Sequence, residues 1–262
     1  MSVIVLDSDI VHYEVLGRGR PLIFLHGWVG SWRYWIPSMQ AASVMFRAYA
    51  VDLWGFGDTA KNSRYTLDDQ MQLLDGFMEY MGIGRVALIG HGLGALLGVY
   101  YALRHPDYVD RVMAISYPMD ETMVNGRLRN SSPLELAEAL LGRSAVTEAV
   151  LTDAPKTDMR ALQISLLDVD GNQDLRTVFR SLPTACLLVN GERDPIIAPP
   201  RIEQLAELPE HTHAITFEQS GHFPMLDETN KFHRLLSDFL NLKSGDSPRE
   251  LQLKEEWKRR VR

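Results

Sequence analysis

The sequence has a single cysteine, no apolar run long enough to cross a membrane, and fewer basic than acidic residues. Cys186 cannot form an internal disulfide, and its place inside an apolar run predicts a buried strand residue. No uninterrupted apolar stretch approaches the roughly 20 residues that a membrane-spanning helix needs. The first residues show neither a basic region nor the long apolar core of a signal peptide, so the expected location is the cytoplasm.

The 262 residues carry a formal net charge of -7. This acidic balance disfavours nucleic acid or an acidic membrane surface as the main partner. The glycines at 90, 92 and 94 lack the G-x-G-x-x-G spacing of a dinucleotide site, and no set of residues has metal-ligand spacing. We therefore expect no cofactor and no metal, and a small molecule as the partner. The sequence gives no indication of oligomeric state.

Short apolar runs recur along the chain and predict the strands of one sheet. Residues 3–6 and 10–15 form two strands joined by a turn at Asp7-Ser8-Asp9, and further strands are predicted at 21–25, 48–51, 86–89, 111–116, 184–189 and 214–217. Several of these runs are apolar throughout, as in central parallel strands covered on both faces. Helical periodicity lies between them, at 67–81, 95–103 and 199–208 and up to residue 240. The alternation predicts an α/β fold with a mostly parallel sheet and helices on both faces.

One segment interrupts this alternation. Residues 118–182 contain helical patches at 133–141, 144–151 and 162–167 but no strong strand, which predicts a helical lid inserted late in the sheet. Residues 1–117 and 183–242 would then form the core. Residues 243–262 are polar and charged, and we expect a mobile tail or a short solvated helix there.

The stretch Ala87-Leu88-Ile89-Gly90-His91-Gly92-Leu93-Gly94-Ala95 has the pattern of a strand, a sharp turn and a helix. Gly90 and Gly94 fit the nucleophile elbow G-x-S-x-G, because only small residues let the strand and the helix pass so closely. The central position of the elbow carries the nucleophile, and here it is Gly92. Glycine relieves the backbone strain of that position but supplies no attacking atom.

Three further segments lie at predicted strand ends: His26-Gly27-Trp28, Asp194-Pro195 and Ser220-Gly221-His222-Phe223-Pro224. The turn Asp52-x-x-Gly55-x-Gly57, with Thr59 two residues on, accompanies them. In this order, these segments and the elbow resemble the α/β-hydrolase superfamily over essentially the whole chain up to about residue 240. Ligands in such folds bind beyond the carboxyl ends of the strands.

The resemblance implies a role for each matching residue. His222 would be the catalytic base and Asp194 the acid that orients it, while the backbone N–H groups of Leu93 and Trp28 would bind the oxyanion. His26 and His91 are expected to be structural, and Asp52 to organise a turn. Asp58, Ser31 and Ser116 are further polar groups at strand ends, but no spacing gives them a role. A cluster of aromatic residues could line an apolar pocket or belong to the core: Trp28, Trp32, Tyr34, Trp35 and Trp54.

Gly92 departs from the superfamily pattern and leaves three interpretations open. The chain could derive from hydrolases of small esters, lactones or related carbonyl compounds, with the nucleophile lost naturally or replaced by engineering. It could instead be an acid/base enzyme without a covalent nucleophile, as in lyases and cofactor-free oxygenases of the superfamily, using His222 and Asp194. It could finally be a receptor-like protein that keeps the pocket for ligand binding. Catalysis by the chain as given is therefore uncertain.

Overall fold

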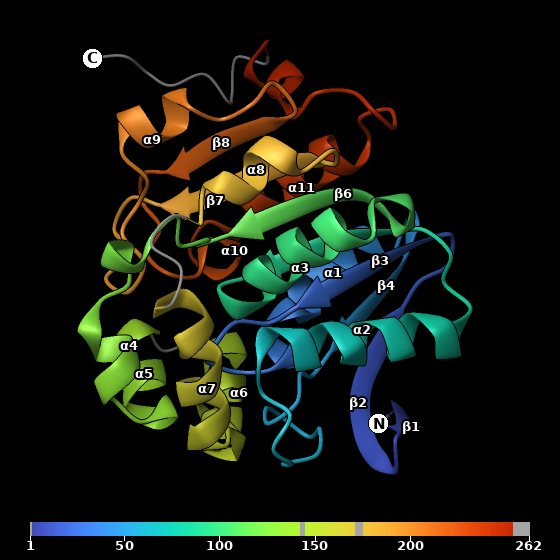
Figure 1. Cartoon of the computed structure of the whole chain (residues 1–262), viewed down its shortest axis with the longest axis vertical. Coiled ribbons are helices and arrows are strands. Elements are labelled where there is room, and N and C mark those ends of the chain that lie inside the picture. The colour runs from blue at the N-terminus through green and yellow to red at the C-terminus, as the bar shows by residue number, and fades with distance from the viewer. Residues whose placement is uncertain (1, 142–144, 171–174, 254–262) are drawn as a thin grey trace.

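The fold is built on one sheet, seen in a computed structural model that describes residues 2–141, 145–170 and 175–253 (Figure 1). Its eight strands have the spatial order β1-β2-β4-β3-β5-β6-β7-β8. The strands are β1 (Ser2–Leu6), β2 (Asp9–Leu16), β3 (Arg20–Leu25), β4 (Phe46–Val51), β5 (Val86–His91), β6 (Val109–Ile115), β7 (Ala185–Gly191) and β8 (Thr212–Phe217). The pairs β1–β2 and β2–β4 are antiparallel, and the other neighbours are parallel. The predicted α/β fold with a mostly parallel sheet is confirmed.

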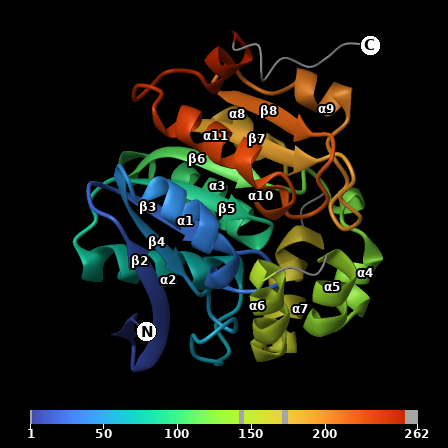
Figure 2. The same ribbon diagram turned by 180° about the vertical axis from the view of Figure 1, so that it is seen from behind.

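Helices cover both faces of the sheet. They are α1 (Ile36–Ala42), α2 (Leu67–Met81), α3 (Leu93–Arg104), α4 (Gly126–Asn130), α5 (Pro133–Leu140), α6 (Ala145–Asp153), α7 (Met159–Asp170), α8 (Thr177–Ser181), α9 (Ile202–Ala206), α10 (Pro224–Asp227) and α11 (Thr229–Leu240). Helices α2, α3 and α8 lie on the face shown in Figure 1, and α1 and α11 on the face shown in Figure 2. The central strands are consequently apolar on both sides, and every residue of β5 is buried.

Short 3-10 turns complete the secondary structure at η1 (Trp32–Trp35), η2 (Pro106–Tyr108), η3 (Glu121–Met123), η4 (Ala154–Lys156) and η5 (Pro248–Leu253). Local signals set several boundaries. Helix α2 begins with a reciprocal capping box of Thr66 and Asp69 and ends at Gly82, whose φ is 64°. Helix α3 ends at Arg104, before His105-Pro106.

The described residues between β6 and β7 are mainly helical, and the term helical insertion is used below for residues 118–141, 145–170 and 175–182. Helices α4 to α7 gather beyond the carboxyl ends of the parallel strands, to which the arrowheads of β6 and β7 point (Figure 1). This is the end of the sheet at which open α/β folds bind ligands. Within the described residues, no helix combines the length and the apolar character needed to cross a membrane.

Two sequence-based expectations need correction. Helix α9 covers Ile202–Ala206 instead of residues 199–208, because the backbone of Arg201 is extended, with ψ 157°, and Pro209 disfavours helical backbone at Leu208. The expected tail needs correction in part for residues up to 253: η5 is a short helix with exposed residues, but the segment also packs against the rest of the chain. Leu251 is fully buried, and Arg249 donates a hydrogen bond to the backbone carbonyl of Leu208 at 2.9 Å. Residues 254–262 lie outside the described residues.

Candidate active site

The turn between β5 and α3 has the geometry of a nucleophile elbow. Its central residue, Gly92, has φ 51° and ψ -109°, a backbone conformation that residues with a side chain rarely adopt. A Cβ atom on Gly90 would lie 2.1 Å from the carbonyl oxygen of Gly94, and one on Gly94 would lie 2.3 Å from that of Leu25. Both flanking glycines are therefore needed for the close passage of strand and helix.

The apex of this turn lies under an indole ring. A Cβ atom on Gly92 would be 3.0 Å from Cε3 of Trp28 and 3.6 Å from Cα of Gly27. Trp28 is fully buried, and its Nε1–H donates a hydrogen bond to Oγ of Ser165 in α7 at 3.1 Å. The ring is thus held between the elbow and the helical insertion.

The residues that follow β7 and β8 bring an acid and an imidazole together. Nδ1 of His222 is 2.8 Å from Oδ2 of Asp194, and both side chains are at most 1% exposed. The other carboxylate oxygen accepts hydrogen bonds from the backbone N–H groups of Ile196 and Ile197 at 2.8 and 3.0 Å. Burial by itself raises the pKa of Asp194, but the charge and hydrogen bond of His222 and the two N–H groups outweigh it, so this pKa lies below its ordinary value. The carboxylate is therefore ionised and fixed in orientation.

The second ring nitrogen of His222 is available for chemistry. Nε2 is buried and has no hydrogen-bond partner among the residues that the structure describes. The ring lies against that of His91, the residue before the apex, with centroids 4.5 Å apart. An imidazole with one nitrogen held by a carboxylate and the other unoccupied can act as a general base.

Hydrogen bonds account for both ring nitrogens of His91. Nε2–H donates to the backbone carbonyl of His222 at 2.8 Å, and Nδ1 accepts from the Tyr34 hydroxyl at 3.0 Å. The Tyr34 oxygen in turn accepts the N–H of Gly27 at 2.6 Å. Burial holds the pKa of His91 well below its ordinary value, so the ring stays neutral. His91 therefore links the His222 loop to the loop after β3, in agreement with the expected structural role.

His26 is likewise bound within its own turn. Its Nδ1–H donates to the carbonyl of Gly27 at 2.8 Å, and its Nε2 accepts the N–H of Leu53 at 3.0 Å. Burial lowers the pKa of His26 below its ordinary value. Its ring therefore holds the chain in the conformation that precedes Trp28.

The two backbone N–H groups expected to bind an oxyanion are those of Trp28 and Leu93. Neither donates a hydrogen bond within residues 2–141, 145–170 and 175–253. The Gly94 N–H donates to the carbonyl of His26 at 3.0 Å, which holds the two segments together. Unpaired buried N–H groups are uncommon in proteins, and a reacting oxygen could satisfy them.

Ser116 is a site residue to which the sequence assigned no role. It follows β6 with a φ of 49°, an uncommon conformation for a residue other than glycine. Its hydroxyl donates to Oδ2 of Asp194 at 3.0 Å, the same oxygen that His222 contacts. Its place at the end of the strand beside β5 was the only signal of this contact in the sequence.

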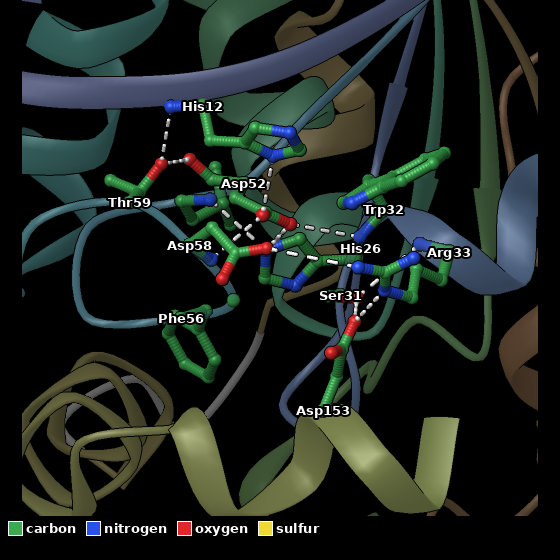
Figure 3. Close-up of polar contacts among 12 residues, drawn as sticks. His12, His26, Ser31, Trp32, Arg33, Asp52, Phe56, Asp58, Thr59 and Asp153 are labelled. Atoms are coloured by element: carbon green, nitrogen blue, oxygen red, sulfur yellow. Dashed lines mark hydrogen bonds and ion pairs between the residues drawn. The ribbon is translucent and has the colours of Figure 1, made fainter. Parts of the chain in front are cut away.

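A second polar cluster lies around Asp52, at the end of β4 (Figure 3). Its Oδ2 is 2.9 Å from Nδ1 of His12 and accepts the N–H of Asp58 at 3.0 Å, while its Oδ1 accepts the N–H of Trp32 at 2.9 Å. Ligand atoms of His12, Asp52 and Asp58 lie within 4.8 Å of one another, a spacing that could suit a metal ion. Since these atoms already hold the turn together and Lys156 binds Asp58 at 2.8 Å, the contacts agree with the expected role of Asp52 as a turn organiser.

Most of the five aromatic side chains that were expected either to line a pocket or to belong to the core belong to the core. Trp28, Tyr34, Trp35 and Trp54 are at most 1% exposed and belong to the hydrophobic core. Trp32 is partly buried. Of this set, Trp28 lies against the apex of the elbow at Gly92, and Tyr34 contacts His91, the residue before the apex.

Comparisons with known proteins agree with the fold. A family model described as the alpha/beta hydrolase family matches residues 22–234. A pimeloyl-[acyl-carrier protein] methyl ester esterase from Vibrio cholerae is 24% identical over 253 residues, covering 87% of this chain and 97% of that protein. A 2-hydroxymuconate semialdehyde hydrolase from Pseudomonas sp. is 24% identical over 255 residues, covering 86% and 88%.

Solved structures show the same fold at low sequence identity. The enol-lactonase from Burkholderia xenovorans LB400 has a TM-score of 0.79 and 21% identity, covering 92% of this chain and all of that one (100%). A meta-cleavage product hydrolase from Pseudomonas fluorescens IP01 also has a TM-score of 0.79 and 21% identity, covering 92% and 97%.

Proposed function

We propose, since the chain belongs to the alpha/beta hydrolase family, that it acts on a small ester, lactone or related carbonyl compound at a site formed by Gly92, His222 and Asp194. The observation that carries this proposal is the buried His222–Asp194 pair, in which Nδ1 is bound at 2.8 Å and Nε2 has no partner among the described residues. The proteins that this chain resembles include a methyl ester esterase and an enol-lactonase, which supports this substrate class.

The proposed reaction uses water in place of a covalent nucleophile, because Gly92 has no side chain. His222 Nε2 takes a proton from the water as its oxygen attacks the carbonyl carbon. The Trp28 and Leu93 N–H groups bind the oxygen that becomes negative, and Asp194 stabilises the imidazolium. The intermediate then expels the alkoxide, which receives the proton from His222, so that the acid and the alcohol are the products.

The helical insertion would serve as the lid over this site. It lies beyond the carboxyl ends of the strands, and Ser165 in α7 holds the indole that covers the elbow (Figure 1). A lid that excludes water strengthens the hydrogen bonds to a developing oxyanion.

A second candidate is a ligand-binding protein without turnover. The Trp28 ring favours it, because its Cε3 would be 3.0 Å from a Cβ on Gly92 and thus covers the position from which a nucleophile would project. In that case the insertion and the elbow would enclose a ligand that binds but is not cleaved.

Four variants assayed on a panel of p-nitrophenyl esters and enol lactones separate these candidates. Gly92→Ser should raise hydrolysis at least about a hundredfold above the unsubstituted chain, which is less than the usual loss on removing a triad member. Gly92→Ala is the matched control, since it adds the same Cβ without the hydroxyl and should give no gain. His222→Ala should remove about a hundredfold or more from both the glycine and the serine forms.

Two results would contradict the proposal. Equal rates for Gly92→Ser and Gly92→Ala would show that residue 92 does not occupy the nucleophile position. An unsubstituted chain that shows ligand-dependent thermal stabilisation, with no turnover sensitive to His222→Ala, would favour the ligand-binding candidate.

A further inference from the structure

A buried carboxylate joins the helical insertion to the loop after β3. Asp153, the last residue of α6, has a side chain that is only 1% exposed. Its Oδ2 accepts hydrogen bonds from Oγ of Ser31 and from Nε of Arg33, each at 2.6 Å. Figure 3 shows Asp153 reaching from its helix toward these two residues. An ionised carboxylate in this position is stable only while these partners remain in place.

Two further charges complete the cluster. Lys156 lies 3.0 Å from Oδ1 of Asp153 and 2.8 Å from Oδ1 of Asp58, and Arg33 is 3.9 Å from Asp58. Two acidic and two basic side chains thus alternate in one cluster. Asp153 and Lys156 belong to the insertion, and Asp58 and Arg33 belong to the core. Burial alone raises the pKa of Asp58, but Lys156 outweighs it and keeps this pKa below its ordinary value. Asp58 is therefore ionised, and the three outer members of the cluster, Arg33, Asp58 and Lys156, are between 27% and 35% exposed.

The same loop also packs closely against α6. Gly30 has a φ of 97°, and a Cβ on it would lie 2.9 Å from Cγ1 of Val150, one helical turn before Asp153. On its other side the loop is held by the hydrogen bond from the Trp32 N–H to Asp52. Residues 27–35 are consequently fixed between the end of β4 and the insertion. This loop includes Trp28, whose N–H is one of the two proposed oxyanion donors.

We propose that Asp153 is a positioning residue, which holds the loop 27–35 through Ser31 and Arg33 and thereby aligns the Trp28 N–H. This inference rests on the proposed function. The carboxylate of Asp153 then both holds the insertion against the core and keeps the Trp28 N–H in position, so the two cannot be lost separately. Because the outer members of the cluster are partly exposed, salt weakens this connection.

Hydrogen exchange on the full chain tests the connection without any assay of turnover. Asp153→Asn should speed exchange at least about tenfold in residues 27–35 and in residues 145–157 together, and 0.5 M NaCl should produce a smaller change in the same two segments. Asp68→Asn is the matched control: it breaks an ion pair with Arg104 of 2.8 Å whose side chains are more than half exposed. The control should leave both segments unchanged.

Milder variants keep the test decisive if Asp153→Asn does not fold. Ser31→Ala removes one hydrogen bond to the carboxylate, and Lys156→Met removes one charge, so each should speed exchange in both segments to a lesser degree. Lys156→Arg preserves the charge and should restore the protection of the unsubstituted chain. Faster exchange confined to residues 145–157 would overturn the inference, because the loop would then be held independently of the insertion.

Turnover provides the second readout, in the Gly92→Ser background. There Asp153→Asn should lower kcat about tenfold and change KM less than about twofold. A misplaced Trp28 N–H reduces the stabilisation of the transition state more than it reduces the affinity for the substrate. Coupled exchange with an unchanged kcat would overturn the positioning role. An inactive Gly92→Ser protein would contradict the proposed function, while the exchange experiment would still decide whether Asp153 connects the two segments.

Discussion

Substitution of Gly92 by alanine should destabilise the fold more than the same substitution of Gly82, a glycine with positive φ whose Cβ position is open. At Gly92 the added Cβ meets two costs. The backbone conformation, with φ 51° and ψ -109°, costs about 1–3 kcal/mol for a residue with a side chain. The Cβ also lies 3.0 Å from the Trp28 ring, and such overpacking typically costs about 1–3 kcal/mol. Since the ring can shift slightly, we expect a total of about 2–4 kcal/mol.

Gly82 provides the matched control. It ends α2 with φ 64° and ψ 34°, and a Cβ on it would meet no atom within 4 Å. Gly82→Ala therefore carries only the cost of the left-handed conformation, about 1–2 kcal/mol. Urea unfolding followed by circular dichroism measures both variants. Thermal midpoints should fall by roughly 2–4 °C for each kcal/mol, so the Gly92 variant should melt clearly below the Gly82 variant.

A double-mutant cycle separates the two costs at Gly92. If the Trp28 ring contributes, Gly92→Ala should cost at least about 0.5 kcal/mol less in a Trp28→Leu background than in the unsubstituted chain. Equal losses for Gly92→Ala and Gly82→Ala, together with no coupling to Trp28, would refute the geometry described for the apex. The outcome also matters for function, because a Gly92→Ser enzyme would gain its hydroxyl at this cost in stability.

Three further predictions concern other parts of the fold. Ser116→Ala removes a hydrogen bond to Asp194 and should lower the unfolding free energy by about 1 kcal/mol, measured by urea unfolding. Ser8→Gly should raise the unfolding free energy by about 0.5–1 kcal/mol, because Asp7 and Ser8 form a two-residue hairpin turn with φ 50° and 74°; an unchanged value would contradict this. Burial lowers the pKa of His213 to about 4, so between about pH 6.5 and pH 4 the unfolded chain binds a proton that the folded chain does not. Stability should therefore fall as the pH falls through this range, and His213→Gln should reduce the slope.

The sequence by itself determined the parts of the fold that depend on neighbouring residues. Apolar runs located all eight strands, and the helical periodicity at 67–81 located α2. The elbow was also visible, since Gly90 is needed for a close contact with Gly94, four residues further along the chain. The resemblance in the order of the segments indicated the hydrolase fold. Such features could be predicted because their physical causes lie within one strand, one helix turn or one loop.

Only the tertiary structure decided which side chains meet. Ser116 and Asp194 are 78 residues apart in the sequence, and Ser31 and Asp153 are 122 residues apart. No local sequence pattern therefore predicts either hydrogen bond. The position of Trp28 over Gly92 depends equally on the packing of two loops and a helix from the insertion. The packed segment around Leu251, which its polar composition concealed, shows the same limit. Contacts between distant residues form only when the whole chain folds. The pattern of neighbouring side chains in the sequence therefore does not predict them.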